Sequence, residues 1–314
     1  MALNAPFDTF SNGVKMPMFG LGTWMSEAEE IETSCRLALK HGYRLIDTAE
    51  LYGNEAEIGD TLQEEFRKDD FKREDVFITT KLWCTHLRID AVEAALRESL
   101  RKLKLDYVDL YLVHQVTAFN EDMTFDRTVK LEDTWKGMEA VYDKKLTRAI
   151  GLSNINVDQL KRIHESGRIP VHNVQIESHL YLPQDEVYNY CKKNHISITA
   201  YASLGSPGRV NFHLGNYPPS PNPFDEPLVQ QLAKKYGKTP AQILLRLQLD
   251  RGIAVIPKSV KESRLIQNAN VFNFRLTKEE IQKLHDEVKH RQRLLTNTFQ
   301  EGHPEDPFAK ERPY

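Results

Sequence analysis

Cysteine is scarce in this sequence, and its scarcity excludes two kinds of site. Only Cys35, Cys84 and Cys191 occur among 314 residues, and they lie far apart. An odd number of widely spaced cysteines gives neither a disulfide framework nor a zinc-binding pattern. None of the three lies in a motif that is typical of a cysteine nucleophile. We therefore expect a reducing compartment, the cytoplasm.

Long apolar runs and an excess of positive charge are also absent. No uninterrupted apolar stretch approaches the roughly 18 residues that a membrane helix needs. The first residues, MALNAPFDTF, have no basic start followed by an apolar run, so they indicate no signal peptide. Lys and Arg number 42 against 45 Asp and Glu, for a net charge of −3. We expect no membrane partner and no nucleic-acid partner.

The composition that is present, 40% hydrophobic and 28% charged, is typical of soluble globular proteins. A chain of this length forms one large domain or two ordinary ones, and an α/β barrel can use all of it. We treat residues 1–314 as a single domain. Near its start, Asn12-Gly13 stands between short apolar runs and predicts a small hairpin, because both residue types tolerate positive φ.

Eight short β-like runs alternate with helix-period segments along the rest of the chain. Several of them, such as VDLYLVH and IAVIP, are almost continuously apolar, as in strands that are buried on both faces of a parallel sheet. The predicted strands are Phe19–Thr23, Arg44–Thr48, Val76–Lys81, Val108–His114, Ala149–Ser153, Val174–Glu177, Ser197–Ala202 and Ala254–Pro257.

The segments between these strands carry the start and stop signals of helices. The helix predicted at Ser26–His41 begins with Ser26, a residue type that caps helices, and ends before Gly42. The run TPAQILLRLQLDRG has Pro240 in its first turn and Gly252 just beyond its end. Near the end of the chain, LTKEEIQKLHDEV predicts an extra helix.

Eight βα repeats predict a (β/α)8 TIM barrel with an N-terminal β-hairpin, extra helices and a C-terminal loop. The alternative is a doubly wound sheet, which usually has the turn G-x-G-x-x-G after its first strand, where this chain reads GLGTWMSE. Three stretches interrupt the repeats: Gln115–Leu131, Gly205–Phe224 and the tail from about Arg291 to Tyr314. Two follow the carboxyl ends of strands, so we expect substrate loops there, with plain surface insertions as the alternative.

Polar residues stand at the ends of consecutive predicted strands. Asp47 ends the second strand and Tyr52 follows in its loop, Lys81 ends the third strand, and His114 ends the fourth. Each has an ordinary structural explanation when it is taken alone. In a barrel, however, these strand ends converge on one face, so the four together predict an active site.

The residue types of this set indicate one kind of chemistry. A tyrosine has a pKa of about 10, and we expect the neighbouring Lys81 cation to lower it. Asp47 would hold Lys81 in place and keep it charged, and His114 would orient a carbonyl by hydrogen bonding. The set describes a general acid that is aimed at a carbonyl oxygen on which negative charge develops.

A series of motifs resembles those of the aldo-keto reductase family, in the family's order. They are GLGTW, YRLIDTAELYGNEAEIG, ITTKLW, LDYVDLYLVH, GLSN, VQIESHLYL and IPKSVKESRLIQN, and they span roughly residues 10–270. The resemblance implies an NADPH-dependent reductase of aldehydes and ketones, a monomer that uses no metal and takes a small-molecule carbonyl substrate. It assigns the proton donor to Tyr52 and the rest of a catalytic tetrad to Asp47, Lys81 and His114.

The same resemblance assigns residues to the cofactor and to the substrate pocket. Phosphate binding after the last strand also agrees with the residues themselves, since helix N-terminal amides and Lys and Arg side chains attract phosphate. The carboxamide would be bound by Ser153, Asn154 and Gln175, the nicotinamide ring by Tyr201, the 2′-phosphate by Lys258, Ser259 and Arg264, and the adenine side by Asn268. Further cofactor contacts would be Thr23, Trp24, Leu204, Ser206 and Gln267, and the substrate pocket would be lined by Trp24, Trp83 and His114.

The chain departs from the family pattern at three positions. Gln267 stands where the family often has Glu, and Ala202-Ser203 stands where many members have Ser-Pro, which removes one expected contact near the pyrophosphate. Gln115-Val116 stands where many have Trp-Pro after the histidine. Because that aromatic usually lines the pocket of aldose-reductase-like members, a narrow aromatic slot is less expected here.

Two other functions remain open at this point. A lysine at the end of a barrel strand can form a Schiff base, so Lys81 would also suit an aldolase. A barrel that binds NADPH without turnover, as a regulatory or structural protein, is the other alternative. The natural substrate is not indicated by the sequence.

Overall fold

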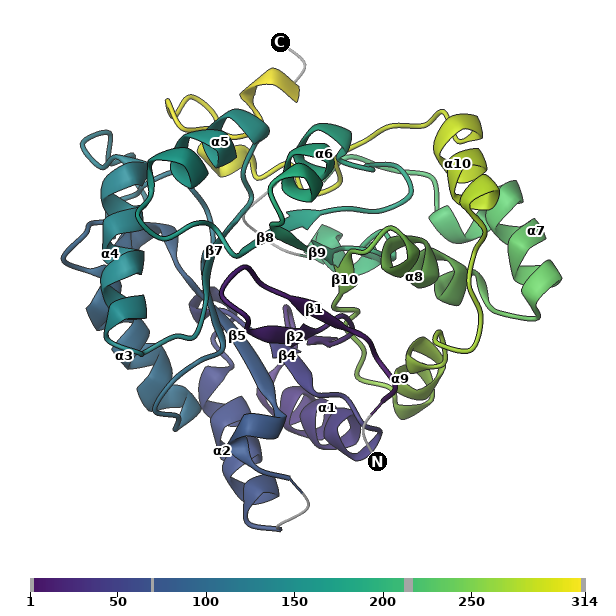
Figure 1. Ribbon diagram of the computed structural model, residues 1–314, viewed down its shortest axis with the longest axis horizontal. Helices are drawn as coiled ribbons and strands as arrows, with labels where there is room; N and C mark the ends of the chain where they lie inside the picture. Colours follow the sequence, from purple (N-terminus) through teal and green to yellow (C-terminus); the bar gives the residue numbers. More distant parts are fainter. Residues whose placement is uncertain (1–2, 69–70, 212–216, 312–314) are drawn as a thin grey trace.

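The computed structural model describes residues 3–68, 71–211 and 217–311. Residues 212–216 of the predicted loop at 205–224, and the end of the predicted tail at Tyr314, lie outside the described residues. A parallel sheet of eight strands forms the centre, and helices surround it (Figure 1). The strands are β3 (Leu21–Gly22), β4 (Leu45–Asp47), β5 (Phe77–Leu82), β6 (Leu110–Val113), β7 (Ile150–Ser153), β8 (Asn173–Glu177), β9 (Ser197–Tyr201) and β10 (Ala254–Val255).

These strands pair in chain order, and the sheet closes on itself. Phe19, just before β3, forms a parallel bridge with Val255 of β10, and the Gly20 N–H donates to the Val255 carbonyl at 2.9 Å. Gly22 lies at this seam, where an added Cβ would meet the Ile256 carbonyl oxygen at 2.5 Å. The barrel prediction is therefore confirmed, each predicted strand overlaps an observed one, and the doubly wound alternative is wrong.

Helices cover the outside of the barrel (Figure 1). Within the described ranges, no helix has both the length and the apolar composition that a membrane crossing requires. The α-helices are α1 (Ala28–Lys40), α2 (Glu55–Phe66), α3 (Val92–Leu103), α4 (Leu131–Asp143), α5 (Val157–Ser166), α6 (Asp185–Lys193), α7 (Pro227–Tyr236), α8 (Pro240–Asp250), α9 (Glu262–Ala269) and α10 (Lys278–Glu287). Short 3-10 turns are η1 (Glu50–Tyr52), η2 (Arg73–Asp75), η3 (Cys84–His86), η4 (Pro207–Asn211), η5 (Pro223–Asp225), η6 (Thr298–Gln300) and η7 (Ala309–Glu311).

The helix signals of the sequence are correct in part. The extra helix near the end of the chain is α10, and α8 has Pro240 in its first turn with Gly252 at φ 73° beyond its end. Ser26 is not the cap of α1, because that helix starts one residue later, after Glu27. Instead, the Ser26 carbonyl accepts a hydrogen bond from the Asn54 side chain at 3.3 Å.

Helix α7 was not predicted, although it precedes α8 as an additional helix between β9 and β10. Its sequence, PLVQQLAKKYG, has Pro227 in the first turn and Gly237 at φ 61° after the last. These are the same start and stop signals that identify α8.

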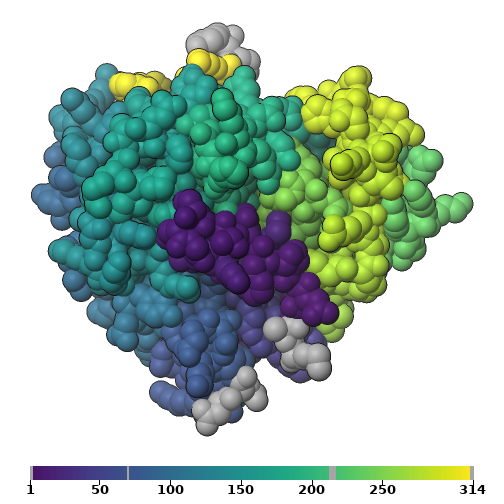
Figure 2. Space-filling view, in the orientation of Figure 1, coloured from purple at the N-terminus to yellow at the C-terminus, as the bar shows by residue number. Residues whose placement is uncertain are grey.

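The predicted N-terminal hairpin lies over the amino ends of the barrel strands. It consists of β1 (Phe7–Thr9) and β2 (Lys15–Pro17), and it crosses the middle of the face in Figures 1 and 2. The Phe10 ring is buried with its centroid 6.2 Å from that of Phe77, the first residue of β5, so the hairpin closes this end of the barrel. The turn spans residues 11–13, since the Phe10 N–H bonds to the Val14 carbonyl, and of Asn12-Gly13 only the glycine takes positive φ, 86°.

The hairpin offers a matched pair of phenylalanines that tests this packing. Phe10→Ala removes a ring that is 2% exposed, and we expect it to lower the free energy of unfolding by about 3–5 kcal/mol. Phe7→Ala removes a ring that is 60% exposed and should change the free energy by less than about 0.5 kcal/mol. Urea unfolding measures both free energies. Equal changes for the two variants would contradict the role of Phe10 as the residue that packs the hairpin against the barrel.

Candidate active site

The carboxyl ends of β4, β5 and β6 bring the four predicted residues together. Asp47 is the last residue of β4, Lys81 lies on β5, His114 follows β6, and Tyr52 ends the turn η1. The Lys81 Nζ lies 2.5 Å from Asp47 Oδ1 and donates to the Tyr52 hydroxyl at 3.3 Å. The rings of Tyr52 and His114 meet edge to face, with centroids 5.6 Å apart. One connected group of side chains results.

The Asp47–Lys81 ion pair is buried and its hydrogen bonds are complete. Lys81 also donates to the Thr48 carbonyl at 2.8 Å, and Asp47 Oδ2 accepts from Gln175 Nε2 at 2.6 Å. Burial lowers the pKa of Lys81 and raises that of Asp47, while the attraction between the two charges opposes both shifts. A buried pair of this kind is costly to disrupt, because a single charge would be left without compensation.

Tyr52 differs from the expectation that its lysine neighbour lowers its pKa. Burial, and then the negative charge of Asp47, raise the pKa of the Tyr52 phenol well above its ordinary value. Lys81 is closer to two other acceptors, Asp47 and the Thr48 carbonyl, than to the phenol. Tyr52 is therefore protonated at neutral pH, which is the form that donates a proton.

His114 is a neutral imidazole at the centre of the site. Burial, and then the charge of Lys81, hold its pKa well below the usual range. Its ring lies edge to face with the Tyr52 ring and also with the Trp83 ring, whose centroid is 5.3 Å away. Among the described residues its Nδ1 has no hydrogen-bond partner. A neutral imidazole can donate one hydrogen bond to an incoming oxygen.

Three stretches of chain build an aromatic wall beside His114. Trp83 follows β5, Phe119 belongs to the stretch predicted at 115–131, and Phe299 belongs to the tail. The Phe299 centroid is 6.2 Å from that of Trp83 and 5.6 Å from that of Phe119. The stretch at 115–131 and the tail therefore meet at this site, while Trp24, the other predicted pocket residue, lies half-buried in the loop after β3.

The departure at Gln115 has a structural counterpart in the tail. Gln115 is buried, and its Oε1 accepts from Gln300 Nε2 at 2.8 Å. The Thr117 hydroxyl donates to the other polar atom of the same amide, Gln300 Oε1. A buried polar network thus holds the tail at the position where the expected pattern has an aromatic ring.

Glu177, the last residue of β8, is a second anchor for the tail that the sequence reasoning missed. Its carboxylate accepts from the N–H groups of Leu294 at 2.6 Å and Leu295 at 3.0 Å, and it lies 3.7 Å from the Arg293 guanidinium. Burial alone would raise the pKa of Glu177, but His179, Arg293 and the Leu294 amide outweigh it and lower that pKa. The sequence signal that could have identified this residue is a charged side chain at the end of the buried strand in the run VQIES.

The residues predicted for the carboxamide lie directly against the tetrad. Asn154 follows Ser153 at the end of β7 and takes φ 51°, which turns its backbone into the left-handed region. Its Nδ2 donates to the His114 carbonyl at 2.8 Å, and its Oδ1 accepts from the Tyr201 hydroxyl at 2.5 Å. Gln175 reaches Asp47, as described above, so the structure brings this set and the tetrad together.

Other predicted cofactor residues surround the same end of the barrel. The buried Thr23 hydroxyl donates to the Asp47 carbonyl at 2.9 Å. After β9, Leu204 is half-buried against two parts of the core, while Ala202 and Ser206 both take positive φ, 56° and 43°. The departure at Ala202 therefore lies at a backbone position that residues other than glycine rarely adopt.

The predicted phosphate residues surround the start of α9. Lys258 and Arg264 are exposed, Ser259 is buried, and the Lys258 ammonium donates to the Met25 carbonyl at 2.9 Å. Gln267 is exposed and Asn268 buried on the same helix. Two exposed cations near a helix N-terminus suit a phosphate group, so these residues fit the cofactor that the sequence indicates.

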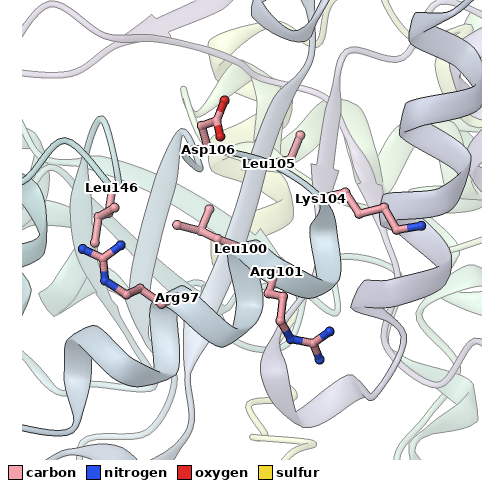
Figure 3. Close-up of a pocket in the computed structure, with 7 residues that line it drawn as sticks. All are labelled: Arg97, Leu100, Arg101, Lys104, Leu105, Asp106 and Leu146. Carbon is pink, nitrogen blue, oxygen red and sulfur yellow. The ribbon is translucent and has the colours of Figure 1, made fainter.

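A hollow of about 390 Å³ on the outside of α3 is not part of this site. Figure 3 shows its residues, which include none of the tetrad. Its cations are paired with carboxylates: Arg97 lies 2.8 Å from Glu93, Arg101 lies 2.7 Å from Glu98, and Lys104 bonds to Asp60. The hollow is lined by Arg97, Leu100, Arg101, Lys104, Leu105, Asp106 and Leu146.

Comparisons with known proteins agree with this geometry. The profile of the aldo/keto reductase family matches residues 17–288. The protein named aldo-keto reductase family 1 member A1 from Gallus gallus is 44% identical over 293 residues, which cover 90% of this chain and 88% of that protein. A crystal structure of Bombyx mori aldo-keto reductase in complex with NADP has 34% identity and a TM-score of 0.89, covering 98% of this chain and 100% of that one. An aldo-keto reductase crystallised with NADPH has 35% identity and a TM-score of 0.89, with coverages of 98% and 94%.

The anchoring of the tail is open to a direct test. Glu177→Gln removes the negative charge that faces the Leu294 and Leu295 amides and Arg293. We expect the free energy of unfolding to fall by about 3 kcal/mol. Limited proteolysis should also cleave the tail faster. Glu311→Gln is the matched control, because Glu311 is an exposed partner of the same arginine. Wild-type cleavage rates for Glu177→Gln would show that this carboxylate does not seat the tail.

Proposed function

The chain belongs to the aldo-keto reductase family, and from that premise we propose that it reduces aldehydes and ketones to alcohols with NADPH at the Asp47–Tyr52–Lys81–His114 tetrad. The observation that carries the proposal is the connected geometry of these four side chains. A protonated Tyr52, hydrogen-bonded to a buried lysine, stands edge to face with a neutral His114 at the carboxyl end of the barrel.

Each of the four side chains has a distinct task in this reaction. The Tyr52 hydroxyl donates its proton to the carbonyl oxygen as negative charge develops there. Lys81 stabilises the resulting phenolate through its hydrogen bond to the same oxygen, and Asp47 fixes Lys81 in position. His114 orients the carbonyl by donating a hydrogen bond. Bound NADPH supplies the hydride to the carbonyl carbon.

The cofactor residues proposed here are those that resemble the family's. Ser153, Asn154 and Gln175 would bind the carboxamide, and Tyr201 would stack on the nicotinamide ring. Gln175 donates a hydrogen bond to Asp47, and Asn154 donates one to the His114 carbonyl. The cofactor residues are therefore fixed in position relative to the tetrad.

The residues near the start of α9 favour NADPH over NADH as the cofactor. Lys258, Ser259 and Arg264 would bind the 2′-phosphate, and Asn268 would bind the adenine side. Support comes from the exposure of the two cations near the N-terminus of α9 and from the related structures that were crystallised with NADP and NADPH. Charge in this place favours a dinucleotide with an additional phosphate.

The two alternative functions fit the site less well. A Schiff-base lysine must reach its substrate, whereas Lys81 is 0% exposed and is held by Asp47 and the Thr48 carbonyl. A barrel that binds cofactor without turnover has no need for a protonated Tyr52 beside a neutral histidine.

We also propose that the protein is a single-domain monomer of the cytoplasm. Cys35, Cys84 and Cys191 are all free and buried in the structure, which suits a reducing compartment.

The loss of NADPH absorbance at neutral pH, with a panel of small aldehydes, sugars and ketosteroids, tests the proposed function. NADH is run beside it. Turnover with NADPH and little with NADH is the expected result. Tight binding of NADPH without turnover of any carbonyl would favour the regulatory alternative instead.

Tyr52→Phe tests the proton donor. We expect the rate of reduction to fall by a factor on the order of 10²–10⁴, because the general acid is lost. The affinity for NADPH, measured by fluorescence titration, should stay near the wild-type value. Near-wild-type turnover in this variant would refute the assignment of Tyr52.

The double variant Lys258→Ala, Arg264→Ala tests the phosphate site. It should weaken NADPH binding about a hundredfold or more and change NADH binding little, because each lost charge-assisted hydrogen bond costs about 1.5–3 kcal/mol. Lys278→Ala, an exposed lysine of α10, is the control. Equal losses for the two dinucleotides would place the 2′-phosphate elsewhere.

A further inference from the structure

Glu50 lies in the stretch LIDTAELYGNEAEIG and has no part in the tetrad. It is the first residue of η1, the turn that ends with Tyr52, and it precedes the first turn of α2. We propose that Glu50 is a positioning residue for carbonyl reduction, because it joins the turn that carries Tyr52 to the turn that carries Trp83. This inference rests on the proposed function.

The carboxylate of Glu50 reaches both ends of the turn η3. Its Oε2 accepts from the Trp83 N–H at 3.2 Å, and Trp83 is the residue directly before this turn. Its Oε1 lies 2.9 Å from the Nδ1 of His86, the last residue of the turn. A single side chain of η1 therefore hydrogen-bonds the residue before η3 and lies within ion-pair distance of its last residue, whose Nδ1 makes no hydrogen bond among the described residues.

The connected turns carry two rings that contact His114. Tyr52 meets the His114 ring with centroids 5.6 Å apart at an interplanar angle of 79°, and Trp83 meets it at 5.3 Å and 69°. Because Tyr52 and Trp83 belong to different loops, their separation depends on what ties those loops together. Glu50 thereby fixes the positions of the two rings relative to each other and to His114, the side chain that orients the carbonyl group.

The same contacts indicate which variant should restore function. A glutamine at position 50 keeps an oxygen for the Trp83 N–H and presents an NH2 group to His86 Nδ1. An alanine loses both contacts. The role is therefore one of geometry, and Glu50→Gln should retain it where Glu50→Ala does not.

Steady-state kinetics of the full-length enzyme, with NADPH and the best carbonyl substrate of the panel, test the inference. For Glu50→Ala we expect KM of the carbonyl to rise about tenfold, while the affinity for NADPH and the melting temperature stay near wild type. Glu50→Gln should lie within about twofold of wild type. Asp60→Ala, which removes an exposed carboxylate of α2 that pairs with Lys104, is the control.

Several outcomes would overturn the inference. They are wild-type kinetics for Glu50→Ala, a glutamine variant as impaired as the alanine variant, or an equal loss of affinity for NADPH. Crystal structures of wild type and Glu50→Ala give a readout that needs no activity. The contact between Trp83 and His114 should be lost or displaced in the variant, and an unchanged contact would refute the role of Glu50. Absence of turnover in the wild type would count against the proposed function alone.

Discussion

The ion pair between Asp47 and Lys81 is the interaction on which the rest of the site depends. It joins β4 to β5 at 2.5 Å, receives Gln175 from β8, and directs the lysine at the hydroxyl of Tyr52. Both charges are withdrawn from water, and the cost of that is offset only while every one of these partners is present. The pair therefore fixes β4, β5, β8 and the turn η1 in position relative to one another.

Much of the barrel and of the tetrad's placement follows from the sequence, because both depend on strand ends. Apolar runs such as VDLYLVH identify the strands, and a polar residue directly after such a run must emerge at the carboxyl face. The direction of the shift in the pKa of Tyr52 did not follow, because it depends on burial and on the charges around the phenol in the folded protein. The start of α1 was also misplaced, since the serine that resembles a cap uses its carbonyl to hold Asn54.

The seating of the tail was beyond prediction for a different reason. Glu177 and Leu294 are 117 residues apart, and Gln115 and Gln300 are 185 apart. No local pattern encodes such pairs, because each residue alone suits many surroundings, and only the folded barrel brings its strand ends to the tail. The bridge from Glu50 to Trp83 is similar on a smaller scale, since it joins loops that follow neighbouring strands.

The origin of the aromatic wall has a consequence for how such an enzyme diversifies. Asp47, Lys81 and His114 stand on barrel strands or directly after them, and Tyr52 stands in the turn that follows β4. Phe299 and Gln300, in contrast, belong to a segment that lies outside the barrel and is fastened by Glu177. Substitutions in that segment can alter which molecules are admitted while the strands that perform the reaction stay as they are. The residues that perform the reaction and the tail that lines the site thus lie on different parts of the chain. Evolution can therefore change the substrate while it keeps the reaction.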